Sequence, residues 1–115
     1  MTNAATFSEQ ITSEVGSWPG VEVDNGELGE LAFTVGPREI GHLHGDHAAH
    51  FSFPPAVWRE LAAQDRITHH PVFPTKTGPA ARQIDDDADV RDVIELFRLN
   101  YDRVVTKHGL PAPAA

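Results

Sequence analysis

The stretch from residue 85 to residue 109, "DDDADVRDVIELFRLNYDRVVTKHG", constrains the fold more than any other part of the chain. Its apolar residues recur every three or four positions, which gives a helix one apolar face, at Val90, Val93, Ile94, Phe97, Tyr101 and Val104. Asp85, Asp86 and Asp87 supply a cap and an acidic first turn, and Gly109 stands where the helix would end. The pattern predicts a long helix over 87–107 that packs its apolar face against a sheet.

Shorter patterns predict the remaining elements. Phe7, Ile11 and Val15 indicate a first helix, and "PPAVWRELAAQ" indicates a second. Alternating apolar residues and turn signals predict strands in "ELGELAFTVG", "PREIGHLHG", "AHFSF", "RITHHPVF" and "AARQI". The sequence therefore predicts one two-layer α+β domain over 1–110, with an antiparallel sheet of about four to six strands and helices packed on one face. We expect a frayed tail over 111–115.

Composition narrows the classes of function. The chain has 115 residues, a formal net charge of −8 and no cysteine. The negative charge disfavours nucleic acid as a partner, and metal ligands would have to come from His, Asp and Glu. The first residues, "MTNAATFSEQ", have neither the basic nor the apolar region of a secretory signal, and no apolar run approaches the roughly 20 residues of a spanning helix, so we expect a cytoplasmic protein without a membrane span. The sequence has no motif for an organic cofactor, and it leaves the cofactor and the oligomeric state open.

The histidine-rich segment "GHLHGDHAAH", residues 41–50, is the main candidate site. Residues two apart in a strand share a face, which groups His42 and His44 with Ile40. If "GD" or "GDHA" forms the turn, Phe51 joins that face and His50 points away. His69 and His70 are adjacent, so we expect one of them, His70, to face the same pocket.

These patterns suggest functional roles for individual residues. The candidate catalytic residues are His42, His44 and His70, and the candidate ligand-binding residues are Asp46, His47, Phe51 and Arg38. A purely structural hairpin explains the same residues, because turns favour Gly and Asp for backbone reasons. Two histidines at i and i+2 can also share a divalent metal ion, with Asp46 or His47 as a third ligand, but no residue is assigned to a metal.

Three segments, "EIGHLHGD", "HHPVFP" and "LFRLNYDRV", resemble the short bacterial luciferase-domain proteins, and the resemblance covers residues 18–105. The family is named for its similarity to fungal luciferase, which oxygenates a hydroxylated hispidin with molecular oxygen. The resemblance implies a cofactor-independent, oxygenase-like activity on a small aromatic or enol molecule in a histidine-lined pocket. The alternative is a non-catalytic domain that binds a small ligand or a protein through structural or pH-sensing histidines.

The chain departs from the family at one point. A Ser-Gly-Trp-like turn is expected after the paired histidines, whereas this chain has "TKTGPAA", with Pro79 in place of the aromatic residue. If that aromatic residue lines the pocket in the family, the ligand of this protein differs from that of its relatives.

Overall fold

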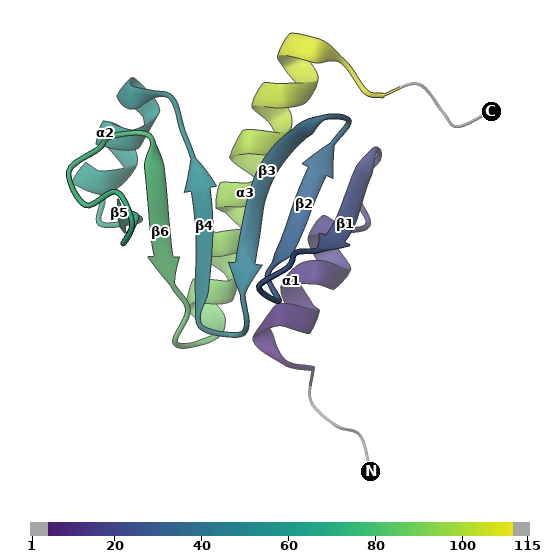
Figure 1. Ribbon diagram of the computed structural model, residues 1–115, viewed down its shortest axis with the longest axis horizontal. Helices are drawn as coiled ribbons and strands as arrows, with labels where there is room; N and C mark the ends of the chain where they lie inside the picture. Colours follow the sequence, from purple (N-terminus) through teal and green to yellow (C-terminus); the bar gives the residue numbers. More distant parts are fainter. Residues whose placement is uncertain (1–4, 112–115) are drawn as a thin grey trace.

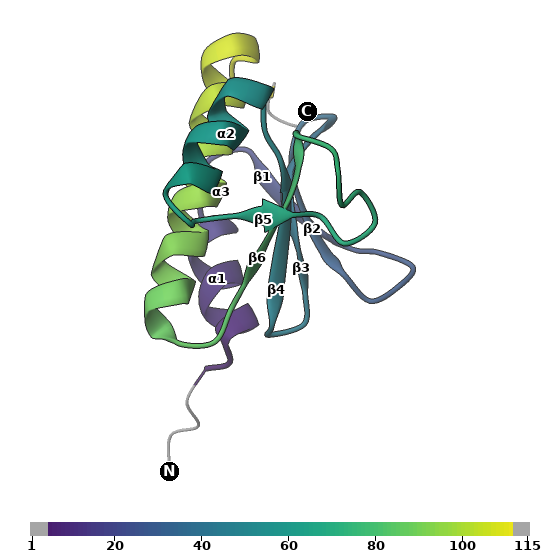
Figure 2. The same cartoon turned by 90° about the vertical axis from the view of Figure 1, so that its left-hand side faces the viewer.

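A long C-terminal helix, α3 (Asp87–His108), runs across one face of a six-stranded antiparallel sheet (Figure 1). The structure is a computed structural model and describes residues 5–111. Asp86 caps α3 by accepting a hydrogen bond from the backbone N–H of Asp89 at 2.9 Å. Two shorter helices, α1 (Phe7–Val15) and α2 (Pro55–Ala63), lie on the same face of the sheet as α3 (Figure 2). All three predicted helices are confirmed.

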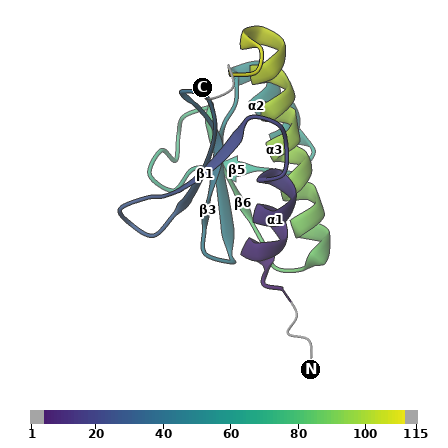
Figure 3. The same ribbon diagram turned by 90° about the vertical axis from the view of Figure 1, so that its right-hand side faces the viewer.

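The strands lie in the order β1-β2-β3-β4-β6-β5, and each pair of neighbours is antiparallel. They are β1 (Val21–Asn25), β2 (Leu31–Val35), β3 (Arg38–His44), β4 (Ala48–Ser52), β5 (Thr68–His69) and β6 (Pro79–Gln83). The helices cover one face, and the loops between β1 and β2 and between β5 and β6 project from the other (Figures 2 and 3). The α+β prediction is confirmed, and the second face of the sheet is open.

Two details of the strand prediction were wrong. The sequence analysis missed β1, "VEVDN", because four of its five side chains are exposed and only Val21 and Val23 form its apolar alternation. In "RITHHPVF" only Thr68 and His69 form a strand, and Pro71, which has no N–H to donate to a ladder, follows shortly after. Residues 112–115 of the expected tail, and residues 1–4 at the other end of the chain, lie outside the described residues.

An aromatic cluster forms the centre of the core between the sheet and α3. Phe97 of α3 packs edge-on against Phe33 and Phe51, with ring centroids 5.0 and 4.9 Å apart. Tyr101, one turn further along α3, packs against Trp18 and donates its hydroxyl hydrogen bond to the carbonyl of Pro19 at 2.6 Å. The predicted burial of Phe33, Phe51, Phe97 and Tyr101 is confirmed.

A β-bulge in β3 decides which side chains face the helices. Phe33 pairs with Gly41 and Thr34 pairs with Glu39, so Ile40 is an extra residue without a partner in β2. Ile40 and Gly41 both turn toward the helix layer, where a Cβ atom on Gly41 would lie 2.6 Å from Cε1 of Phe97. The sequence prediction that placed Ile40 on the face of His42 and His44 was therefore wrong.

The buried amide of Asn100 in α3 ties this bulge to the helix. Its Nδ2 donates to the carbonyl of Ile40 at 3.2 Å and to the carbonyl of Ser52 at 3.1 Å. Its Oδ1 accepts from the guanidinium of Arg103 at 3.0 Å. Every polar atom of the Asn100 side chain is thus paired, and two of its bonds hold β3 and β4 against α3.

The aromatic core generates the first prediction. Replacing Phe97 with Ala leaves a cavity among Phe33, Phe51 and Gly41, and we expect it to lower the free energy of unfolding by about 3–5 kcal/mol. Leu28→Ala is the matched control, because Leu28 is 89% exposed and its truncation should change stability by less than about 0.5 kcal/mol. Chemical denaturation measures both, and equal effects of the two substitutions would contradict the placement of Phe97.

Candidate functional site

The length of the turn between β3 and β4 determines which face of the sheet His50 shares with His42 and His44. β3 and β4 pair His42 with His50, Leu43 with Ala49 and His44 with Ala48, which leaves residues 45–47 as the turn. Residues directly opposite each other in an antiparallel pair share a face. His50 therefore joins His42 and His44, and the prediction that Phe51 would do so was wrong. It assumed a turn of two or four residues, and an odd number reverses the faces of β4.

Four imidazole rings meet on the open face of the sheet, and we call His42, His44, His50 and His70 the histidine cluster. The ring centroid of His50 lies 5.2 Å from that of His42 and 4.4 Å from that of His44. The ring of His70, which follows β5, lies 4.2 Å from the ring of His50. One nitrogen from each of His42, His44 and His50 lies within 4.8 Å of the other two.

Glu39 orients one ring of the cluster. The Nδ1 atom of His42 lies 3.0 Å from Oε2 of Glu39, and because a carboxylate only accepts, Nδ1–H is the donor. Glu39 and His42 are three residues apart, and they share a face only because the bulge at Ile40 lies between them. The lone pair of His42 is then on Nε2.

His69, in β5, and His70, which follows it, lie on opposite sides of the sheet. His69 packs its ring on Trp58 of α2, with centroids 4.6 Å apart, whereas His70 contacts the cluster. Nδ1 of His70 accepts a hydrogen bond from the backbone N–H of Val72 at 3.1 Å. A neutral His70 therefore carries its proton on Nε2 and can donate it to a ligand.

Burial and crowding favour the neutral form of three rings of the cluster, those of His44, His50 and His70. Burial, followed by the neighbouring His70, His44 and His42, lowers the pKa of His50 to about 4. Burial is also the largest cause that lowers the pKa of His44 and the pKa of His70. The Nδ1 atom of His50 is buried and has no hydrogen-bond partner within residues 5–111. The cluster thus presents unprotonated nitrogens, one of them unsatisfied.

Other residues predicted for the site lie elsewhere. Phe51 is buried against Phe97 on the helix side. Asp46, in the turn, accepts the backbone N–H of Ser8 at 2.8 Å and so caps the start of α1, while His47 is exposed beside it. Arg38 begins β3, at the other end of the strand from His44. The structure brings together three of the predicted residues, His42, His44 and His70.

Sequence reasoning missed His50 and Glu39. An odd-length turn was a simple alternative that would have placed His50 correctly. No sequence signal marks the bulge at Ile40. The side-chain contact between Glu39 and His42 depends on this bulge, so no sequence signal indicates the contact either.

Small side chains and two loop tips surround the cluster. Ala32 lies opposite His42, Ala48 lies opposite His44 and Ala81 lies opposite His50, so the cross-strand neighbours of these three rings are small. The loop tips carry exposed apolar residues, which are Leu28 between β1 and β2, and Val72 and Phe73 between β5 and β6. The ring of Phe73 lies 5.5 Å from that of His70. The face is polar at its centre and has apolar groups on the adjoining loops.

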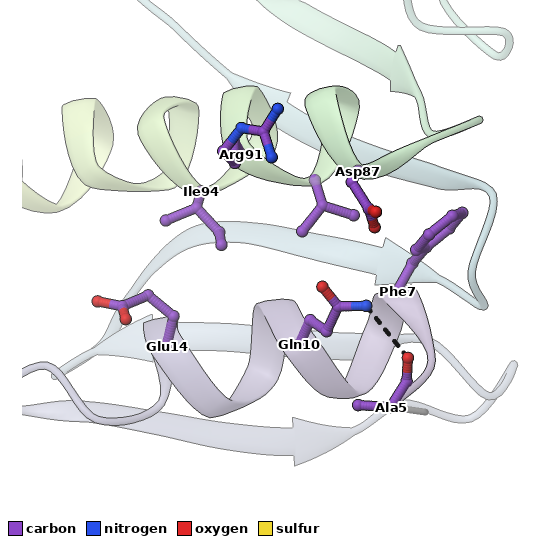
Figure 4. Close-up of a pocket in the computed structure, with 8 residues that line it drawn as sticks. Ala5, Phe7, Gln10, Glu14, Asp87, Arg91 and Ile94 are labelled. Carbon is purple, nitrogen blue, oxygen red and sulfur yellow. Dashed lines mark hydrogen bonds between the residues drawn. The ribbon is translucent and has the colours of Figure 1, made fainter. Parts of the chain in front are cut away.

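Two hollows of the described surface contain none of the four histidines of the cluster. One of about 700 Å³ lies along the seam between α1 and α3, where Gln10 bonds to the carbonyl of Ala5 (Figure 4). A second of about 350 Å³ includes Arg38 together with Arg103 and Lys107. The seam contains no histidine and no pair of reactive groups, so the chemistry of the described residues favours the histidine cluster over the larger hollow.

Comparison with known proteins gives one match. The family model of the luciferase domain matches residues 37–100, a segment that runs from the start of β3 into α3 and includes Glu39 and the whole histidine cluster. Searches of curated proteins and of solved structures found no match. Among the described residues, no helix has the length and apolar character needed to span a membrane.

The depressed pKa of His50 generates a prediction about acid stability. Between pH 6.5 and about 4 the unfolded state binds a proton at this residue that the folded state does not, so the free energy of unfolding falls as the pH falls through this window. The groups that face His50 are His42 and His44 of β3, His70 after β5 and, through His42, Glu39. His50→Gln should flatten this dependence in chelator-treated protein, as measured by urea denaturation at several pH values.

Acid also protonates carboxylates, so the wild-type curve is compared with that of His47→Gln, which changes an exposed histidine in the turn between β3 and β4. A pH dependence that is identical in His50→Gln and in wild type would show that His50 is not held neutral by its surroundings.

Proposed function

The chain belongs to the luciferase-domain family, and from this premise we propose that it binds a small enol or phenol on the histidine cluster and prepares it for reaction with oxygen. The observation that carries the proposal is the convergence of four imidazoles on one open face, with centroid separations of 4.2–5.2 Å between His50 and its three neighbours. An imidazole is the side chain best suited to accept or donate a proton near neutral pH.

The cluster offers complementary partners for a hydroxyl group. Glu39 holds the proton of His42 on Nδ1, so Nε2 of His42 accepts. The N–H of Val72 holds His70 in the opposite tautomer, so Nε2–H of His70 donates. A ligand hydroxyl placed between the rings gives its proton to an accepting nitrogen, and its oxygen receives a hydrogen bond from a donating one. The enolate or phenolate that results is the electron-rich form that reacts with oxygen.

The surroundings favour an aromatic or otherwise apolar ligand body. Phe73 and Val72 lie on the loop beside His70, and Leu28 lies on the loop between β1 and β2. Pro79 lies on the same face as Ala81, two residues away along β6, so the aromatic side chain expected there in the family would border the cluster. Because proline is shorter, this edge is less covered, and we expect a ligand that differs in size from that of relatives with the aromatic residue.

The proposal is tested with a panel of hispidin-like enols and small aromatic acids. We expect at least one to bind wild-type protein in isothermal titration and to show the absorption of its deprotonated form when bound at neutral pH. His42→Gln and His70→Gln should each weaken binding by about tenfold or more, the effect of one lost hydrogen bond of about 1.4 kcal/mol. The fold should remain cooperative, because neither residue is in the core.

The control is His108→Gln, which should bind like wild type because His108 lies at the end of α3. A ligand whose affinity is unchanged in both cluster variants but lost in Arg38→Gln would place the site at the other end of β3 and refute the proposal. Binding to the cluster without consumption of oxygen would instead identify a non-catalytic ligand-binding domain.

A further inference from the structure

We propose that His42, His44 and His50 together bind one divalent transition-metal ion of the zinc class. The inference deepens the proposed function, on which it rests for the role of the site, while the metal site itself is argued from side-chain geometry. Sequence reasoning considered Asp46 or His47 as the third ligand and assigned none. The structure replaces both with His50, which the turn of residues 45–47 brings to the same face.

The spacing of the three nitrogens fits a shared ion. They lie within 4.8 Å of one another, and three imidazole nitrogens bound at about 2.0–2.1 Å in a tetrahedral site lie about 3.3 Å apart. Small rotations of the side chains close this difference. The backbone needs no movement, because the ladder between β3 and β4 holds His42 directly opposite His50, and His44 lies two residues along the same strand.

The hydrogen bonds around the cluster prepare it for a cation. Metal-bound histidines commonly donate their second ring N–H to a carboxylate, which fixes the tautomer and raises the basicity of the ligating nitrogen. Glu39 accepts such a bond from Nδ1 of His42 at 3.0 Å, and this leaves Nε2 as the free ligand atom. The carboxylate also places a negative charge beside the proposed cation site.

His50 provides an independent observation. Its Nδ1 atom is buried and has no hydrogen-bond partner among the described residues. Buried polar atoms are almost always paired, so an unpaired one on a ring in contact with three other imidazoles indicates a missing partner. A bound ion, by ordering all three rings, gives this histidine a partner.

The site has three ligands and an open position. His70 uses Nδ1 to accept from Val72, so its Nε2 carries a proton and is not a ligand in this tautomer. Three protein ligands with a remaining exchangeable position are typical of catalytic sites, whereas structural zinc sites have four. The open position faces the same side as Ala32, Ala48 and Ala81, where a ligand oxygen can reach the ion. His70 is placed to donate a hydrogen bond to that oxygen.

The ligand set selects the class of metal. Imidazole nitrogens suit zinc, cobalt, nickel, copper and iron, whereas calcium and magnesium prefer oxygen ligands. An ion of this class would bind the enol or phenol oxygen directly and stabilise its deprotonated form, the role that a bare imidazole has in the metal-free protein.

The test uses tag-free protein stripped with chelator and titrated with Co²⁺, followed by visible absorption and by isothermal titration with Zn²⁺. We expect one ion per chain, d–d absorption of a low-coordinate nitrogen site, and a higher unfolding temperature when metal is bound. His50→Gln and His44→Gln should abolish the absorption. Glu39→Gln should retain it with affinity lower by about 10- to 100-fold, as expected for a positioning residue.

Two control variants, His108→Gln and His47→Gln, each change a histidine outside the proposed ligand set. His108→Gln should bind metal like wild type, and circular dichroism of each variant verifies that loss of metal is not loss of fold. The proposal is overturned if wild type binds no ion, if His50→Gln binds as wild type does, or if His47→Gln abolishes binding while His50→Gln does not.

The same titrations separate this inference from the proposed function. Ligand binding is measured in chelator and again with one equivalent of Zn²⁺. A protein that binds the enol or phenol in chelator but binds no metal refutes the metal site and leaves the proposed function standing. A protein that binds one Co²⁺ through the three histidines but none of the ligand panel in either condition supports the metal site and refutes the proposed function.

Discussion

The hydrogen bond from Nδ2 of Asn100 to the carbonyl of Ile40 holds the feature on which the site depends, the bulge in β3. Without the extra residue, every side chain that precedes it in β3 would change face. Glu39 would then point to the helices, and His42 would lack the carboxylate that orients it. The bulge also places Ile40 and Gly41 side by side on the helix face, where Phe97 packs against Gly41. One irregularity thus shapes both the core and the cluster.

The residues that stabilise the fold and the residues of the candidate site lie on opposite faces of the sheet. Its covered face carries the aromatic core around Phe97, and its open face carries the imidazoles. Arg82 of β6 forms ion pairs with Asp89 and Asp92 of α3, which join the sheet to the helix on the covered side. Substitutions among the histidines therefore remove few apolar contacts, whereas substitutions on the other face affect folding directly.

The secondary-structure elements could be predicted well where the apolar residues recur with one regular spacing. The apolar spacing of residues 90–104 predicted α3 to within a residue of its observed end at His108, because a long amphipathic helix repeats its signal over several turns. The first strand escaped notice because, at the edge of the sheet, most of its side chains need not be apolar.

Part of the composition of the site could be predicted, but its geometry could not. His42, His44 and His70 were identified correctly as neighbours, since residues two apart in a strand share a face. His50 and Phe51 lie on the opposite faces from those predicted, because one additional turn residue moves every side chain of β4 to the other face of the sheet. The length of the turn is weakly encoded in "GDHA". The partner of His42 depends on the bulge, which is stabilised by Asn100 from 60 residues away. Local sequence does not report such a contact.

The most direct test of this account is the set of nuclear Overhauser effects between side-chain rings in metal-free protein. We expect cross-peaks between the imidazole protons of His50 and those of His44 and His70, whose ring centroids lie 4.4 and 4.2 Å away. The ring of Phe51 should give cross-peaks to Phe97 instead, at a centroid separation of 4.9 Å. Cross-peaks between His42 and Phe51, with none from His50 to the other imidazoles, would contradict both the turn and the cluster.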